Sequence, residues 1–228
     1  GGRAERLTAG VGEVRYPRFS PDGTQMAFVG REEGPSEVYV MPALGGPAQR
    51  LTFQSASCRV LGWSPAGDEI LYASNAGQFA GRFEVIYAVK PSGGLPRQLP
   101  FGMANAISYS REGGVVIGRN INVREFSHWK RYRGGTAGHL WCDAAGNGSF
   151  KRLLQVNGNV ADPCWIGARI YFLSDHEGIG NIYSCTPDGN DLQRHTQHED
   201  FYARHLSTDG QSLVYHSGAD LYLFDPAS

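Results

Sequence analysis

The chain has 228 residues, 41% of them hydrophobic and 19% charged, so it can bury a sizeable core and has an ordinary globular composition. Its net charge of −1 gives no general attraction to nucleic acid or to an anionic membrane, and neither is expected as a partner. No run of about 18 apolar residues occurs, so no transmembrane helix is predicted. The 31 glycines and 12 prolines favour many short strands joined by turns.

The first repeat unit, residues 10–52, contains four signals in a fixed order. It opens with a strand that ends in the turn Phe19–Gly23, where Ser, Pro and Gly occupy the positions that suit a type I turn. An apolar strand over Gln25–Val29 follows, and then a strand with a central aromatic residue, Val38–Met41. After a Gly-rich turn, an outer strand is predicted over Gln49–Thr52.

The same signals return along the rest of the chain. Their spacing of about 41 to 56 residues is typical of β-propeller blades. The further units are 53–101, with strands at 69–73, 86–89 and 97–100; 102–155, with strands at 115–118, 140–143 and 151–154; 156–197, with strands at 169–173, 182–185 and 192–196; and 198–228, with strands at 212–215 and 221–224.

The two ends of the chain carry two parts of one further repeat. The phrase Arg50-Leu51-Thr52 ends the first outer strand, and it recurs at Arg6-Leu7-Thr8, whereas the last unit has no outer strand of its own. We therefore expect Arg3–Thr8 to pair with the strand Asp220–Asp225. The sequence predicts an all-β, single-domain propeller over 1–228, with five four-stranded blades, the last made from 198–228 plus 1–8.

The longest unit holds an insertion, Asn120–Thr136, with a basic run next to His128 and Trp129. Arginine suits bidentate recognition of a carboxylate, so this run is a candidate peptide-binding element. A solvated long loop packed over Trp129 explains the same residues. The basic residues concerned are Lys130, Arg131 and Arg133.

Motifs for catalysis are missing or incomplete. The sequence has no G-x-S-x-G elbow, and neither His176-Glu177 nor His198-Glu199 is completed to H-E-x-x-H. Two alternatives stay open: a metal cluster against ordinary hydrogen bonding for the histidines, and a glycosidase-type carboxylate pair against turn formation for the acids. The histidines are His176, His195, His198, His205 and His216, and the acids are Asp175, Glu177, Glu199, Asp200 and Asp209.

No cofactor or metal is expected. None of the four cysteines is close to another in sequence, and none forms a C-x-x-C pair. They therefore predict free thiols in a reducing, cytoplasmic compartment rather than disulfides or a zinc site. They are Cys58, Cys142, Cys164 and Cys185.

The phrases Phe19–Gly23, Val38–Met41 and Arg50–Thr52 resemble the WD40-like repeat of TolB and tricorn propellers. Four blocks in the second half are similar to the tricorn protease family: Trp129–Gly138, Arg169–Gly178, Asn181–Ser184 and His198–Tyr202. The first propeller of that family has six blades and precedes a second propeller, a PDZ domain and a serine-protease core. The resemblance therefore implies that most of one blade is missing here, through a natural or engineered truncation.

The resemblance also implies a function. It predicts a non-catalytic propeller that gates or scaffolds the passage of peptides, with peptide or protein partners at channel-mouth loops and a monomeric state in isolation. Basic residues of the family propeller anchor the C-terminal end of a peptide, and Arg82 in the loop Gln78–Phe83 is the matching candidate, beside Lys130, Arg131 and Arg133. The alternatives are a TolB-like protein-interaction module and a five-bladed glycosidase-like enzyme.

Overall fold

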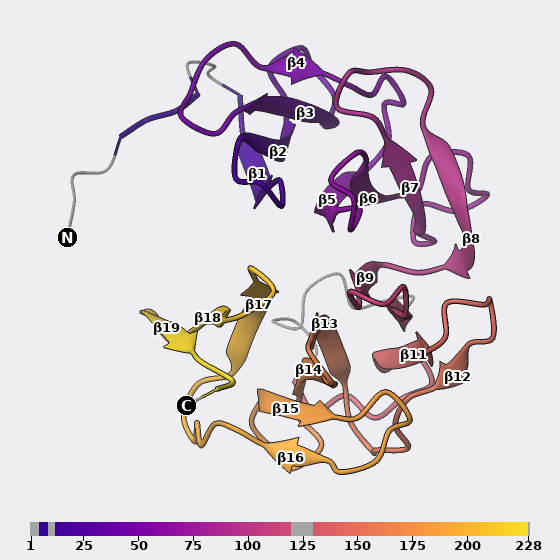
Figure 1. Cartoon of the computed structure of the whole chain (residues 1–228), viewed down its shortest axis with the longest axis vertical. Coiled ribbons are helices and arrows are strands. Elements are labelled where there is room, and N and C mark those ends of the chain that lie inside the picture. The colour runs from indigo at the N-terminus through magenta and orange to yellow at the C-terminus, as the bar shows by residue number, and fades with distance from the viewer. Residues whose placement is uncertain (1–4, 9–11, 120–129, 228) are drawn as a thin grey trace. The chain divides into compact units, whose positions relative to one another are not determined.

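The computed structural model describes residues 5–8, 12–119 and 130–227, and these contain strands and turns but no helix. None of these residues therefore forms an apolar helix that could cross a membrane. The chain divides into two compact units, residues 1–103 and 104–228, each described by itself (Figure 1). His128, Trp129, Arg3 and Ala4, which figure in the sequence predictions, lie outside the described residues.

Two four-stranded antiparallel sheets form the first unit. In both, the order of the strands in space is their order in the sequence. The first sheet contains β1 (Val14–Phe19), β2 (Gln25–Gly30), β3 (Glu37–Pro42) and β4 (Gln49–Arg50), and the second contains β5 (Cys58–Trp63), β6 (Ile70–Ser74), β7 (Val85–Val89) and β8 (Arg97–Met103).

Three sheets form the second unit, two with four strands and one with three. The third sheet contains β9 (Ala106–Tyr109), β10 (Val115–Arg119), β11 (His139–Asp143) and β12 (Lys151–Arg152). The fourth contains β13 (Val160–Ile166), β14 (Arg169–Ser174), β15 (Asn181–Cys185) and β16 (Gln193–Arg194). The fifth contains β17 (Ala203–Thr208), β18 (Leu213–Ser217) and β19 (Asp220–Phe224). The predicted all-β fold with five blades is confirmed.

The predicted turn between the first two strands of a blade forms as the sequence indicates. The Gly23 N–H donates to the Ser20 carbonyl at 2.8 Å, and Gly67 repeats this bond with Ser64 at 2.9 Å. Both glycines have a positive φ, +70° and +72°, which a residue with a Cβ rarely adopts. Serine and glycine therefore fix the turn through local chemistry.

The core lies between successive sheets within each unit. In the first unit, side chains of β2 and β3 pack against those of β6 and β7, with Tyr72 fully buried among them. In the second unit, the fourth sheet packs on the third through Phe172 and on the fifth through Leu173. Because β14 is covered on both faces, its apolar residues are consecutive rather than alternating.

The predicted fourth strand of the last blade is not formed by the described residues. The fifth sheet has three strands, residues 5–8 lie in no strand, and Leu221 and Leu223 of β19 are 89% and 73% exposed. Three of the outer strands are very short, since β4, β12 and β16 each pair through only two residues. Those three follow their partner strand through a short turn, whereas residues 5–8 are separated from β19 by almost the whole length of the chain.

Candidate functional site

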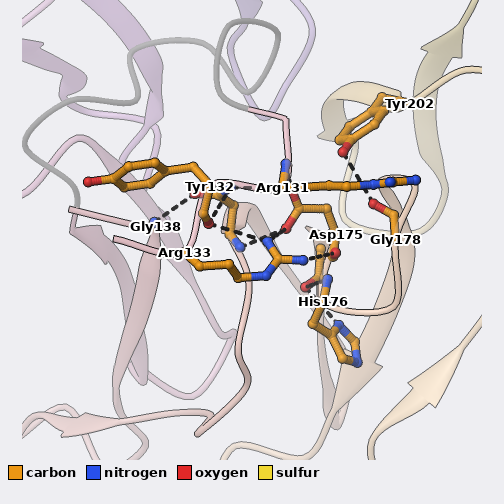
Figure 2. A network of polar contacts seen from close by, with 10 residues as sticks. Arg131, Tyr132, Arg133, Gly138, Asp175, His176, Gly178 and Tyr202 are labelled. Atoms are coloured by element: carbon orange, nitrogen blue, oxygen red, sulfur yellow. Dashed lines mark hydrogen bonds and ion pairs between the residues drawn. The ribbon is translucent and has the colours of Figure 1, made fainter. Parts of the chain in front are cut away.

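The basic run predicted from sequence lies in the segment before β11, and a buried carboxylate holds this segment in place. The described part of it, residues 130–138, is called the basic loop here, and the carboxylate belongs to Asp175, directly after β14 (Figure 2). Asp175 is completely buried. Arg131 has a φ of 55°, a left-handed conformation that is unfavourable for a side chain of its size. The loop therefore needs support from elsewhere in the unit.

Asp175 supplies that support through both carboxylate oxygens. Its Oδ1 accepts from Arg133 Nη1 at 3.0 Å and from the Asn159 N–H at 2.8 Å. Its Oδ2 accepts from the Arg131 N–H at 2.8 Å and from Asn159 Nδ2 at 3.2 Å. A buried carboxylate with an arginine partner and this many donors is well compensated for the loss of water.

Arg133 and Asn159 complete the attachment of the loop. Arg133 Nη2 donates to the Asp175 carbonyl at 2.9 Å, so this guanidinium bonds both the side chain and the backbone of one residue. The Asn159 amide donates to the Tyr132 carbonyl at 3.3 Å and accepts from the Gly138 N–H at 3.2 Å. We conclude that Arg133 positions the loop, and that its charge is balanced by Asp175.

Tyr202 lies beside this network and is only 4% exposed (Figure 2). Its hydroxyl donates to the Gly178 carbonyl at 3.2 Å, and Figure 2 shows the Arg131 side chain extending toward Gly178 below it. Lys130 Nζ and Arg204 Cζ lie 5.6 and 5.8 Å from the centre of the Tyr202 ring, within cation–π range. Burial, helped by Asp175, raises the pKa of Tyr202, and the charge of Arg131 opposes that shift.

Arg82, the other predicted peptide-binding residue, belongs to the first unit, and the basic loop belongs to the second. Arg82 is exposed, and its guanidinium carbon lies 5.1 Å from the centre of the Phe83 ring. The loop around it is short and ordered by local bonds, such as that from Asn75 Nδ2 to the Gly81 carbonyl at 2.9 Å. The neighbouring Phe79 is 87% exposed and packs on Phe83.

Two serine–histidine pairs occur in the fourth blade, but neither offers a usable nucleophile. Ser174 Oγ lies 2.9 Å from His176 Nδ1, and Ser184 Oγ lies 2.7 Å from His195 Nε2. Both serines are completely buried, so a substrate cannot reach either hydroxyl. Burial also lowers the pKa of both histidines. These pairs are internal hydrogen bonds rather than a catalytic arrangement.

The acids considered as glycosidase residues have structural partners instead. Asp175 is bound by Arg133, and Glu177 accepts from Tyr183 Oη at 2.9 Å and from Arg194 Nη1 at 3.3 Å. Asp209 accepts the Ser212 N–H at 2.7 Å within its turn, and such bonds to the backbone lower its pKa. Glu199 and Asp200 are exposed. These contacts favour the turn-forming and stabilising interpretation of the acids.

Histidines and cysteines show no arrangement for a metal in the part of the chain that is described. No group of three or more His, Cys, Asp or Glu side chains is placed there to hold an ion. His198 Nε2 lies 3.1 Å from Tyr215 Oη, and the rings of His205 and His216 stack at 4.9 Å. None of the four cysteines forms a disulfide, and burial raises the pKa of the Cys142 thiol to about 11.

Sequence reasoning missed the roles of three residues here. Asn159 is a single polar residue outside any motif. Tyr202 ends the block His198–Tyr202, but nothing in that block indicated a contact with the basic run, and Arg204 resembles many other surface arginines. Asp175 was singled out, but as a turn former or a glycosidase acid and not as the partner of Arg133. Only the spacing of the blocks around Arg133 and Asp175, which lie 42 residues apart, could have hinted at contact between them.

Comparison with known proteins agrees with the fold and covers the whole chain. The family model of the tricorn protease N-terminal β-propeller domain matches residues 1–228. Tricorn protease homolog 1 of Streptomyces coelicolor is 44% identical over 227 residues, which are 99% of this chain and 21% of that protein. The tricorn protease of Thermoplasma acidophilum is 34% identical over 235 residues, 99% of this chain and 22% of that protein.

Comparison with solved structures supports the same family and fold. The crystal structure of the tricorn protease matches with a TM-score of 0.87 and 33% identity, covering 97% of this chain and 22% of that chain. A putative TolB from Agrobacterium tumefaciens, at 20% identity, shares the fold with a TM-score of 0.71 over 94% of this chain and 78% of that one. This chain thus spans about a fifth of the length of the tricorn relatives. It belongs to the family of tricorn protease N-terminal β-propeller domains.

Proposed function

We propose that this chain is a non-catalytic propeller domain that binds peptides weakly and guides them for a peptidase core present in longer relatives. The observation that carries the proposal is the basic pair Lys130 and Arg131, held beside Tyr202 on a loop fixed by Asp175. Neither side chain has an ion-pair partner among the described residues. Their charge is therefore available to a peptide carboxylate.

Several features support a role in binding rather than in catalysis. The two serines that contact a histidine are buried, and the chain covers about a fifth of relatives named as proteases. Loops commonly carry the function of a propeller, because its strands are used in packing. In this proposal Arg133 positions the loop, whereas Lys130 and Arg131 contact the peptide. Arg82 is a second, separate candidate contact.

Two measurements on the purified 228-residue chain test the proposal. A fluorogenic peptide panel should show no turnover above buffer, and activity that follows the protein peak through repurification would overturn the non-catalytic role. Calorimetric or NMR titration with a short peptide should give a dissociation constant near the millimolar range, because solvated charge contacts contribute about 1 kcal/mol each. Affinity unchanged by Lys130→Ala and by Arg131→Ala would contradict the assigned site.

A further inference from the structure

We propose that Lys130, Arg131 and Arg204 form one carboxylate-binding site around Tyr202, and that the site selects acidic peptides. The inference rests on the proposed peptide-binding function and deepens it. It adds Arg204, which comes from β17 and not from the basic loop, and it names the chemical class of the ligand.

Segments far apart in the sequence meet at this site. Lys130 and Arg131 lie just before β11, and Arg204 is the second residue of β17. The ring of Tyr202 is the common contact, with Lys130 Nζ at 5.6 Å and Arg204 Cζ at 5.8 Å. Arg131 Nη2 lies 4.0 Å from the point that a Cβ on Gly178 would occupy, next to the carbonyl that accepts the Tyr202 hydroxyl. Two cationic groups therefore lie over one ring, and a third lies beside Gly178, whose carbonyl accepts the hydroxyl of that ring.

No ion pair with a described acid compensates the positive charge of the cluster. Several other arginines of the described chain do have close acidic partners: Arg50 with Glu33, Arg97 with Glu69, Arg169 with Asp191, and Arg194 with Glu177. None of Lys130, Arg131 and Arg204 forms an ion pair with a described acid. The three groups carry the same charge, so each of them attracts an anion that binds at this place.

None of the acids closest in sequence forms an ion pair with Lys130, Arg131 or Arg204. Asp175 is buried beneath Arg133, and Glu177 is bonded to Arg194 and to the Tyr183 hydroxyl. Glu199 and Asp200 precede β17 and are exposed, without an ion pair to the three cations. In the described chain, Lys130, Arg131 and Arg204 therefore keep their charges without an ion-pair partner.

Hydrogen bonds hold the Arg131 backbone and the Tyr202 side chain in place without a ligand. The Arg131 N–H bonds to Asp175, and the Tyr202 hydroxyl bonds to the Gly178 carbonyl. Preorganised groups lose little conformational entropy on binding. Two guanidinium groups can each bond a carboxylate through two N–H groups, and the lysine adds a point charge. The arrangement suits one or two carboxylates of an acidic peptide.

The experiment compares two tetrapeptides with the full 228-residue chain, one with two glutamates and one with glutamines in their place. At low salt the glutamate peptide should bind about tenfold more tightly by NMR titration, and 0.5 M salt should remove most of that preference. Arg204→Gln should reduce the preference about threefold to fivefold. Arg111→Gln, which removes an exposed charge from the turn after β9, is the matched control and should leave it unchanged.

Each outcome separates this site from the proposed function. If both peptides bind equally, or if Arg204→Gln and Arg111→Gln act alike, the carboxylate site is wrong while peptide binding stands. If neither peptide binds, the proposed function itself is wrong. If inorganic phosphate binds at micromolar concentration and the glutamate peptide does not, the site is an anion site of another kind. Thermal melting of both variants checks that each remains folded.

Discussion

The first and fourth blades hold their outer strands with the same set of hydrogen bonds. Thr52 Oγ1 accepts the Val38 N–H at 2.9 Å, and Thr196 Oγ1 accepts the Ile182 N–H at the same distance. In both blades the arginine two residues before the threonine donates Nε to the threonine carbonyl at 2.9 Å. These hydrogen bonds involve the strand with the central aromatic residue and the outer strand with the pattern Arg-x-Thr. The blades therefore repeat the same contacts as well as the same sequence pattern.

The residue at the centre of that set differs between the two blades. Glu37 accepts from Thr52 Oγ1 and from the Ser55 N–H at 2.5 and 2.8 Å, and its charge is balanced by Arg50 Nη2 at 3.2 Å. Asn181 accepts from Thr196 Oγ1 and from the His198 N–H, both at 2.8 Å.

The Asn181 amide also donates, to the carbonyls of Ile179 and His198, both at 3.1 Å. A carboxylate has no proton to donate and needs a cation when it is buried, whereas an amide meets the same backbone groups without one. One position in the repeat can therefore be filled by either chemistry, provided that the neighbours match it.

The largest difference between the two blades is the residue that directly follows the second strand. The fourth blade has the buried Asp175 at the position where the first blade has the exposed Arg31. Asp175→Ala should lower the free energy of unfolding by about 3 kcal/mol, because it leaves the Asn159 N–H and Arg133 without their partner. Urea unfolding measures the loss.

Arg31→Ala is the control for Asp175→Ala, and it should change stability by less than about 0.5 kcal/mol. Hydrogen exchange should become faster over residues 130–138 only in the Asp175 variant. Similar losses in the two variants would show that Asp175 does not hold the basic loop.

Substitution of the two threonines compares a hydrogen bond to a charged acceptor, Glu37, with one to a neutral acceptor, Asn181. Thr52→Val removes a hydrogen bond to a buried carboxylate and should cost about 2 to 3 kcal/mol of stability. Thr196→Val removes one to an amide and should cost about 1 kcal/mol. Both changes keep the side-chain shape, so equal losses by urea unfolding would mean that the charge of Glu37 is already satisfied by Arg50.

Lowering the pH should reduce the stability of the fourth blade but not that of the first, which contains no histidine in residues 14–52. Burial is the main factor that lowers the pKa of His176, His195 and His198. Around His176 the acids Glu177 and Asp175 oppose this shift, and Arg133 and Arg194 reinforce it. Arg169 reinforces the shift at His195.

A lowered pKa means that the unfolded chain binds more protons than the folded one. Stability is therefore complete above the ordinary histidine value near 6.5, and it falls as the pH drops from there through the folded pKa values. Hydrogen exchange at pH 7.5 and 5.5, corrected for the intrinsic rates, should show lost protection in β14 to β16 and little change in β2 and β3. Uniform loss across both blades would contradict the assignment to these histidines.

The smallest expected effect comes from the central tyrosines of the two blades. The Tyr183 hydroxyl donates to Glu177 Oε2 at 2.9 Å, whereas the buried Tyr39 hydroxyl has no hydrogen bond of normal geometry. Tyr183→Phe should cost about 1 kcal/mol, and Tyr39→Phe should be neutral or slightly stabilising. Thermal melting of the two variants gives the comparison, and a larger loss for Tyr39→Phe would reverse it.

Local features of this protein could be predicted from the sequence. These features depend on neighbouring residues and on the alternation of side chains between the two faces of a strand. Examples are the Ser20–Gly23 turn, the strand around Tyr183 and the outer-strand phrase Arg50–Thr52. The number of blades follows, because each blade repeats those signals in order. The sequence also located the basic loop, since Lys130 and Arg131 are visible as a run of charge.

Only the tertiary structure decided how that loop is used. Arg133 and Asp175 are 42 residues apart, and Arg131 adopts a left-handed backbone that no local signal predicts. The same holds for Tyr202, where Lys130 and Arg204 meet. Such contacts follow from which sheets pack together and how a loop is pinned between them. Residue spacing cannot encode this, because many partners satisfy the same charge and size, and packing selects among them.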